Sequence, residues 1–218
     1  MKKHLLVSLG AAILFVLGLA HVNASEKDPP SAEVLFNGRD LSGWIPMHGG
    51  EWSVEDGAIV GRNGVNWTTN PEKSGSWLRS VKEYSDFLFE CEYTISKNGN
   101  SGIFLRSAIE KNPAFSGHEL QIVDDFGRVP QVYTTGALYD VVAAAKNMSK
   151  PAGEWNQVKI MARGARIRIW LNGAPVVDYT SSRRTRGYLG LQNHDDATVV
   201  RFRHLRIREN LSAATSLP

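Results

Sequence analysis

Polar side chains alternate with aliphatic ones in three segments that lie far apart in the sequence, Asn100–Arg106, Glu119–Asp124 and Gly187–His194. In an extended strand successive side chains point to opposite faces, so each segment sends its aliphatic residues one way and its polar residues the other. If one sheet carries all three strands, its polar face gathers Arg106, Glu119, Gln121, Gln192 and His194. These groups can bind hydroxyls and move protons, which suits the recognition and chemistry of a polar, ring-shaped ligand.

The competing interpretation is a sheet face that is simply wet, because an antiparallel sheet packed on one side shows the same alternation. Two further residues also have two interpretations each. Asp124 either forms a turn at the end of its strand or accepts hydrogen bonds from a ligand. Trp67, in a loop rich in glycine and asparagine, is either a core residue or an exposed platform for a sugar, and the loop favours the platform.

The sequence contains no recognisable cofactor motif. It has no phosphate-cradling glycine loop, no His and Cys cluster at metal-ligand spacing and no nucleophile-elbow serine. The pair Asp195 and Asp196 lacks the ordered acidic spacing of a calcium loop. We therefore predict no cofactor, while a divalent metal ion bound by carboxylates remains open.

Many short strand-like runs, separated by turn residues, make up the chain after residue 32. Asp56-Gly57 and Asn172-Gly173 each join two such runs, which is a strong hairpin signal. Only Val141–Met148, short and rich in alanine, is a candidate helix. The pattern predicts one all-β domain at 33–208, built as an antiparallel β-sandwich or jelly roll.

Two details predict how the strands fill the core. Phe202 is out of phase with Leu205 and Ile207, so a bulge near Arg203 and His204 would bring all three to one face. The single cysteine, at position 91, alternates in phase with the aromatic residues of its strand and is expected to be a buried apolar residue.

The first residues have the pattern of a secretory signal. Lys2 and Lys3 precede an apolar run, and Val22-Asn23-Ala24 offers small residues for cleavage. The run is shorter than the roughly 20 residues of a membrane span, although a retained N-terminal anchor is the alternative. We expect a signal peptide at 1–24, a linker at 25–32, a tail at 209–218, and export to the periplasm or beyond with no membrane attachment after cleavage.

The charge balance argues against a nucleic-acid partner. The whole chain carries a formal net charge of +3, and without the two leader lysines 25 − 2 = 23 basic residues face 22 acidic ones. No base-reading motif accompanies the arginines of the C-terminal third.

A series of motifs, taken in order, resembles the 3-keto-disaccharide hydrolase domain family. They are Leu35–Trp44, Trp52–Gly57, Asn100–Arg106, Glu119–Asp124, Gly136–Tyr139, Glu154–Asn156, Leu171–Gly173, Gly190–Gln192 and Phe202–Arg203. Together they extend over nearly the whole chain after the expected leader. The fold of this family is similar to the sandwich of laminin-G modules and β-glucanases, so the resemblance implies a concanavalin A-like fold.

The resemblance implies activity on glycosides that carry a ketone at ring carbon 3. Such a ketone acidifies the proton on carbon 2, so a base can form an enolate that expels the group on carbon 1, and water addition gives net hydrolysis. Glu119 or His194 would be the base, and Arg106 would steady the enolate oxygen. The residues that would hold the sugar are Asn100, Gln121, Asp124, Gln192 and Trp67, with Tyr139 near the leaving group.

The partners that the resemblance implies are a sugar or glycoside substrate and a sugar 3-oxidoreductase that makes the ketone. Two other functions stay open. A noncatalytic carbohydrate-binding module would share the fold without an active site. An ordinary glycosidase would need two suitably separated carboxylates, and only Glu119 stands out, with Asp124 a poor second.

Overall fold

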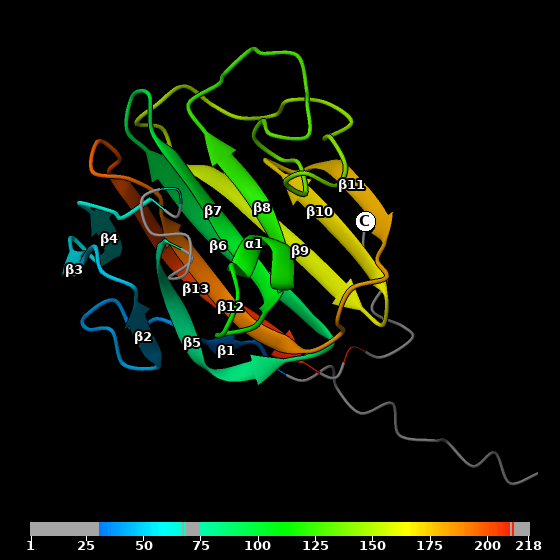
Figure 1. Cartoon of the computed structure of the whole chain (residues 1–218), viewed down its shortest axis with the longest axis horizontal. Helices are drawn as coiled ribbons and strands as arrows, with labels where there is room; N and C mark the ends of the chain where they lie inside the picture. The colour runs from blue at the N-terminus through cyan, green and yellow to red at the C-terminus, as the bar shows by residue number, and fades with distance from the viewer. Residues whose placement is uncertain (1–30, 67, 69–74, 210, 212–218) are drawn as a thin grey trace, which may run out of the picture.

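The computed structural model describes residues 31–66, 68, 75–209 and 211, which form two antiparallel β-sheets packed face to face (Figure 1). Sheet A has eight strands, in spatial order β11 (Ala174–Thr180), β10 (Arg166–Leu171), β9 (Asn156–Arg163), β6 (Phe87–Ile95), β13 (Val200–Glu209), β4 (Ala58–Arg62) and β3 (Glu51–Glu55), with β1 (Glu33–Val34) paired to β13. Sheet B has five, in the order β2 (Trp44–Met47), β5 (Ser76–Tyr84), β12 (Gly187–Asn193), β7 (Asn100–Ser107) and β8 (His118–Val123). The predicted all-β sandwich is therefore confirmed.

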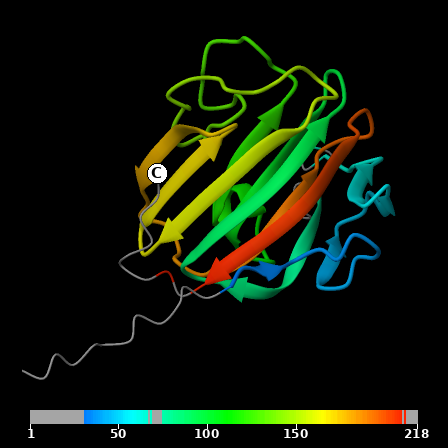
Figure 2. The same ribbon diagram turned by 180° about the vertical axis from the view of Figure 1, so that it is seen from behind.

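Each sheet has one face in the core and one face turned outward. Sheet B and the short helix α1 (Pro113–Ser116) lie toward the viewer in Figure 1, and β13, β6, β9 and β10 cross the front when the molecule is turned round (Figure 2). The helix packs on the outer face of sheet B, where Ala114 contacts Trp77 and Phe104. The helix α1 therefore covers part of the outer face of sheet B.

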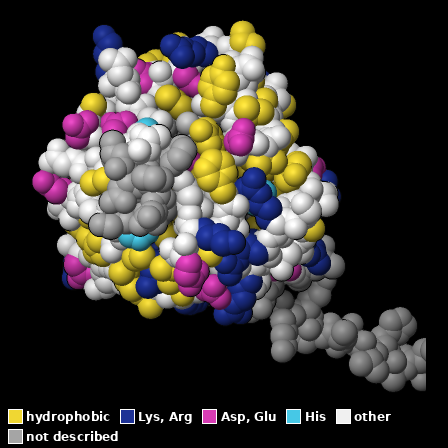
Figure 3. Space-filling view, viewed as in Figure 1, with side chains coloured by type: hydrophobic (Ala, Val, Ile, Leu, Met, Phe, Trp, Pro, Cys, Tyr) yellow, Lys and Arg dark blue, Asp and Glu magenta, His cyan; other side chains and the backbone are white. Residues whose placement is uncertain are grey.

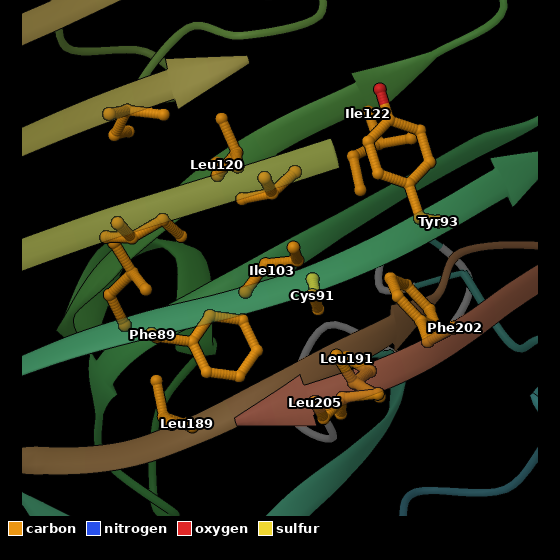
Figure 4. Packing of buried hydrophobic residues seen from close by; sticks show 14 of the residues in the cluster. Phe89, Cys91, Tyr93, Ile103, Leu120, Ile122, Leu189, Leu191, Phe202 and Leu205 are labelled. Atoms are coloured by element: carbon orange, nitrogen blue, oxygen red, sulfur yellow. The ribbon is translucent and has the colours of Figure 1, made fainter. Parts of the chain in front are cut away.

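The strand period of two explains which side chains fill the space between the sheets. On β6, Phe89, Cys91 and Tyr93 point inward, and they meet residues from sheet B, namely Ile103, Leu120, Ile122, Leu189 and Leu191 (Figure 4). Burying a side chain of this size stabilises the fold by about 1.5–3 kcal/mol. Cys91 is 4% exposed, as expected for a core residue, and burial raises the pKa of its thiol.

Both predicted hairpins are present. Asp56 and Gly57 connect β3 to β4 with φ angles of 50° and 72°, and Asn172 and Gly173 connect β10 to β11 with φ angles of 51° and 80°. Positive φ at both central positions is what a two-residue turn between twisted strands requires, and Asn, Asp and Gly tolerate it best.

The predicted bulge in the last strand is also present. The register of β13 against β6 shifts between Arg203 and Arg206, and His204 has a φ of 56°. The extra residue brings Phe202 and Leu205 to the same face, where both are fully buried.

One expected element is wrong, and other expectations fall outside the described residues. Val141–Met148 forms turns and an isolated bridge in place of a helix. Within the described ranges no helix is long and apolar enough to cross a membrane. The expected signal peptide at 1–24, most of the linker at 25–32 and most of the tail at 209–218 are not described.

Candidate functional site

A small pocket on the outer face of sheet B brings together polar side chains from three strands. Its lining is Asn100, Asn112, Ala114, Phe115, Glu119, Gln121, Tyr139, Gln192 and His194. The three segments pair side by side in the order β12, β7 and β8. The alternation in the sequence therefore predicted correctly that Glu119, Gln121, Gln192 and His194 share one face, with Asn100 beside them.

Glycine 102 makes room for the carboxyl group of Glu119 at the floor of this pocket. Gly102 pairs with Gln121, and the next outward position on β7, Phe104, pairs with Glu119. A Cβ atom built on Gly102 would lie 2.1 Å from Oε1 of Glu119, so the carboxyl group occupies the space that any side chain here would fill. Glycine on this face therefore fixes where the acid lies.

Glu119 is a buried acid without a hydrogen-bond partner on one oxygen. The residue is 3% exposed, and Oε1 contacts no donor among the described residues. Removal from water disfavours the charged carboxylate and raises the pKa of Glu119 to about 8. At neutral pH the group is mostly protonated and can donate a hydrogen bond to an oxygen in the pocket.

Two glutamines and an asparagine flank this acid. Gln121 Nε2 donates to Asn100 Oδ1 at 3.3 Å, which fixes the orientation of both amides. Gln192 comes from the neighbouring strand, and its buried Oε1 has no hydrogen-bond partner among the described groups. The pocket thus contains oriented amides together with acceptors that a hydroxylated ligand could satisfy.

His194 stands at the edge of the pocket and is oriented by the residue that follows it. Its Nδ1 lies 2.7 Å from Asp195 Oδ2, and the other carboxylate oxygen accepts from Thr198 N at 2.9 Å. The bond to His194 contributes to a lowered pKa of Asp195, against the opposing effect of burial, so the carboxylate stays charged. A carboxylate accepts from Nδ1–H, so in the neutral ring Nε2 is the acceptor, and Asn66 Nδ2 lies 3.3 Å from it.

The rim of the pocket comes from a segment that the sequence did not point to. Asn112 caps α1 by accepting from Ala114 N at 3.1 Å, and Pro113 starts the helix. From the loop before β12, Arg183 donates to the carbonyls of Ala114 at 3.0 Å and Gly117 at 2.7 Å. Asn112, Ala114 and Phe115 were missed because a single helical turn has no periodicity, although Asn before Pro is a recognisable helix start.

Tyr139 lies beside this rim and lines the pocket. Its ring centroid is 6.2 Å from that of Phe115, with the planes tilted by 52°. Its backbone N–H donates to the carbonyl of Glu119 at 2.9 Å, which fixes the loop to the strand that carries the acid. Burial, with a smaller contribution from Glu119, raises the pKa of Tyr139.

The position expected for Arg106 is wrong. Its guanidinium does not line the pocket but donates to the carbonyls of Ser85 at 2.8 Å and Gly164 at 2.7 Å, with Asp86 at 3.3 Å. The reason is a bulge in β7: Arg106 has a φ of 53°, and the register against β12 shifts at this point. A residue in this conformation breaks the alternation, so the side chain leaves the polar face and holds two turns together.

Two other predicted binding residues do not contribute to the described pocket. Asp124 accepts from Asn98 N at 2.8 Å, so it forms the turn at the end of the sheet and does not reach the ligand side. Trp67 lies outside the described residues. In the described part of the chain no three His, Cys, Asp or Glu side chains gather to hold a metal ion, and the possible divalent metal stays a prediction without a located site.

Comparison with known proteins confirms the resemblance noted in the sequence. The 3-keto-alpha-glucoside-1,2-lyase-like domain family matches residues 31–208. A 3-keto-disaccharide hydrolase of Bacteroides thetaiotaomicron is 25% identical over an alignment 228 residues long. The match covers 80% of this chain and 77% of that protein. The crystal structure of a candidate glycosyl hydrolase from Parabacteroides distasonis has 25% sequence identity and a TM-score of 0.68, covering 83% of this chain and 94% of that one. The β-glucanase of Bacillus licheniformis shares the fold alone, with 13% identity, a TM-score of 0.53 and coverage of 84% and 100%.

Proposed function

The chain belongs to the 3-keto-alpha-glucoside-1,2-lyase-like domain family, and from this premise we propose that it cleaves glycosides that carry a ketone at ring carbon 3. The observation that carries the proposal is Glu119, an acid that is 3% exposed, unpartnered on Oε1 and placed in one pocket with a carboxylate-oriented histidine. A pure binding surface has no need for a buried acid of this kind, because leaving it unpartnered costs free energy.

The reaction needs a base, a group that stabilises the enolate oxygen and a proton for the leaving group. We assign the base to Nε2 of His194, whose Nδ1 lies 2.7 Å from Asp195 Oδ2; the substrate would displace Asn66 Nδ2, which lies 3.3 Å from Nε2. The base takes the proton from carbon 2, and the electron pair moves toward the oxygen on carbon 3 to form the enolate. The enolate then reforms a carbonyl, the new double bond joins carbons 1 and 2, and the bond from carbon 1 to the leaving oxygen breaks. The proton that His194 took from carbon 2 passes to the leaving oxygen, so the histidine is restored.

We assign Glu119, in its protonated form, to the oxygen on carbon 3. A neutral carboxylic acid in a dry site can donate a strong hydrogen bond to an oxygen on which negative charge develops. This replaces the role expected for Arg106, whose guanidinium is engaged with Ser85 and Gly164. Water then adds across the double bond of the product, with hydroxyl to carbon 1 and a proton to carbon 2, which completes net hydrolysis.

The size of the pocket defines how a sugar would enter. The enclosed volume is about 30 Å³, room for about one water molecule. A pyranose ring would therefore enter by the edge that carries carbons 2 and 3, and the rim side chains Phe115 and Tyr139 would turn outward. Asn100, Gln121 and Gln192 would then bind the ring hydroxyls, and the leaving group would lie toward the rim.

A direct glycosidase is the weaker function on the same geometry. Retaining and inverting glycosidases use two carboxyl groups on opposite sides of the bond that is cleaved. Glu119 is the one carboxyl group among the described residues that line the pocket.

As parts of the same proposal, the leader at 1–24 would export the enzyme, and a sugar 3-oxidoreductase would supply its substrate.

The test compares a 3-keto-disaccharide with its unoxidised parent and follows the products by mass spectrometry. We expect cleavage of the ketone alone, reduced about 10²-fold in Glu119→Gln and about 10³-fold in His194→Ala. Glu154→Gln, an exposed glutamate away from the pocket, serves as the matched control and should behave as wild type. Cleavage of the parent would instead indicate a glycosidase, and saturable binding without cleavage would indicate a binding module.

A further inference from the structure

Thr198 is a buried threonine that does not line the pocket but hydrogen-bonds to residues that shape it. It belongs to the loop that joins β12 to β13, which lies beside the turn from β6 to β7 at one end of the sandwich (Figure 1). Charged side chains of both signs are scattered over the pocket side of the molecule and face water (Figure 3). Thr198, unlike these groups, is 0% exposed, so water cannot replace the hydrogen bonds of its hydroxyl.

The hydroxyl of Thr198 joins two segments of the site. Its Oγ1 donates to Asp195 Oδ1 at 2.8 Å and accepts from the backbone N–H of Asn100 at 2.9 Å. The single proton of the hydroxyl is therefore engaged, and its direction is fixed. Threonine is also branched at Cβ, which restricts the rotation of the side chain. Thr198 thus holds the loop between β12 and β13 at a fixed distance from the start of β7.

On one side of Thr198 the contacts lead to His194. Asp195 Oδ1 also accepts from the backbone N–H of Thr198 at 2.9 Å, and Asp195 Oδ2 lies 2.7 Å from His194 Nδ1. Burial opposes the ionisation of Asp195, but the hydrogen bonds from His194 and Thr198 lower its pKa, so the carboxylate stays charged. The carboxylate that orients the ring of His194 is therefore itself oriented by Thr198.

On the other side of Thr198 the contacts lead to the amides of the pocket floor. Asn100 is the first residue of β7, and its Oδ1 accepts from Gln121 Nε2 at 3.3 Å. A shift of the Asn100 backbone would therefore move the amide groups that bind ring hydroxyls in the proposed complex. One hydroxyl group thus links the residue that orients the histidine to the amides.

We infer that Thr198 is a positioning residue for the cleavage reaction. Through Asp195, its hydroxyl fixes the place of His194 relative to Asn100. The inference rests on the proposed function, in which His194 takes the proton from carbon 2 while Asn100 binds a ring hydroxyl. Proton transfer requires the base to lie within hydrogen-bond reach of a ring that the amides hold in place. A misplacement of about 1 Å costs about 10² in rate, and losing one of several hydrogen bonds to Asp195 should cost less.

The first test removes the hydroxyl and keeps the shape of the side chain. Thr198→Val should lower kcat for a 3-keto-disaccharide about tenfold and change KM less than about twofold. Thr198→Ser keeps the hydroxyl, so its kcat should stay within about twofold of the wild-type value. If Thr198→Val does not fold, Thr198→Ala gives the same comparison, because its smaller side chain leaves room for a water molecule at Asn100 N.

The matched control is a second buried threonine with the same number of hydrogen bonds. Thr135 is 1% exposed and does not line the pocket, and its Oγ1 accepts from Val123 N at 2.9 Å and donates to Val123 O at 2.8 Å. Thr135→Val should lower the stability about as much as Thr198→Val, because each leaves a buried backbone N–H without its acceptor. Its kcat per folded molecule should equal that of wild type, and an equal kcat in the two valine variants would overturn the inference.

A double variant shows whether Thr198 acts through Asp195. Asp195→Asn already breaks the contact with His194, so adding Thr198→Val should lower kcat less than about twofold further. A further loss of about tenfold would mean that Thr198 acts by another route and would overturn the inference.

Nitrogen NMR of His194 tests the positioning without relying on cleavage. With the ring neutral, wild type and Thr135→Val should show the Nδ1–H tautomer, and Thr198→Val should show a mixture of the two tautomers. If wild type cleaves no 3-keto-glycoside, the proposed function fails, and this comparison still decides whether Thr198 orients the histidine. A mixture in Thr198→Val alone would support that role, and the wild-type tautomer in both variants would overturn it.

Discussion

The two outward faces of the sandwich carry similar residue types but use them differently. On sheet A, charges are paired across neighbouring strands, with Arg166 Nη2 to Asp178 at 2.6 Å, Arg203 to Glu92 at 2.7 Å and Lys159 to Glu90 at 3.3 Å. On sheet B, Glu119 Oε1 and Gln192 Oε1 are buried without a partner among the described groups, and both residues line one pocket. Sheet A also has buried atoms without a described partner, Thr94 Oγ1 and Arg208 Nε, but these residues do not line the groove that Glu90 and Lys159 line.

Cavity size alone would point to sheet A and not to the pocket on sheet B. The groove on the outer face of sheet A encloses about 450 Å³ and is lined in part by Glu90, Glu92, Lys159 and His204. The pocket on sheet B encloses about 30 Å³. Paired, partly exposed charges are already satisfied and contribute at most about 1 kcal/mol each, whereas buried unpartnered groups cost free energy and are retained where they have a use. Unpartnered polar groups that gather in one pocket are therefore a better guide to the candidate site than volume is.

The largest effect should be on the pH dependence of folding. The pKa of Glu119 is about 8 in the folded chain against 4.5 for the free group, so between these values the folded state binds more protons than the unfolded state. The contribution of Glu119 to stability is therefore complete below pH 4.5 and is lost as the pH rises toward 8. Glu119→Gln removes this loss, with an upper limit of about 5 kcal/mol above pH 8.

Chemical denaturation across this pH range measures the effect. Glu90→Gln is the matched control on sheet A, because Glu90 is half-exposed beside Lys159, and its curve should run parallel to that of wild type. Parallel curves for Glu119→Gln and wild type would show that the acid is not held protonated and would remove the contrast between the faces.

Each outer face has a histidine next to a carboxylate, so variants of the two histidines can compare how much each face contributes to activity. His194 lies 2.7 Å from Asp195 in the pocket, and His204 lies 3.4 Å from Glu92 on sheet A. His194→Gln should lower kcat/KM for a 3-keto-glycoside about 10³-fold, because it removes the base. His204→Gln should change it less than about twofold, and a comparable loss in both variants would mean that the faces do not differ in function.

A buried arginine should matter for stability and not for catalysis. Arg106→Met leaves the carbonyls of Ser85 and Gly164 without their donor and should lower the free energy of unfolding by about 3 kcal/mol. Arg166→Met, on the exposed face of sheet A, should lower it by less than about 1 kcal/mol. If Arg106→Met keeps the wild-type stability but loses kcat/KM per folded molecule, Arg106 would have to act in the pocket after all.

The smallest effect should come from the residue that orients the base. Asp195→Asn keeps Oδ1 for Thr198 but replaces the oxygen that accepts from His194 Nδ1 with an amide nitrogen. The ring should adopt the other tautomer, so kcat should fall about 10- to 30-fold with little change in KM. Nitrogen NMR of His194 would report the tautomer, and an unchanged tautomer with unchanged kcat would contradict a positioning role.

Alternation in the sequence predicted both the core and most of the pocket floor. Leu120 and Ile122 are buried between the sheets while Glu119 and Gln121 face outward, because a regular strand keeps the period of two. The same rule failed at Arg106, where a non-glycine residue with a φ of 53° starts a bulge that no local signal announces.

The burial of Glu119 could not be predicted from its own strand. It depends on covering elements that are distant in the sequence or irregular, namely the single turn of α1 and the loop that carries Tyr139. Asp124 is the opposite case. Its position at the end of a strand already indicated a turn former, and in the structure it accepts a hydrogen bond within that turn region.

The most direct test of the account is proton abstraction at carbon 2. A 3-keto-glycoside cleaved in D2O should give a sugar product with deuterium on carbon 2, because that proton leaves during elimination and a solvent deuteron returns with water addition. The free product incubated in D2O without enzyme corrects for spontaneous exchange. Deuterium at carbon 2 that follows cleavage and is lost in His194→Gln is the predicted result, whereas cleavage with no deuterium beyond the control would contradict the account.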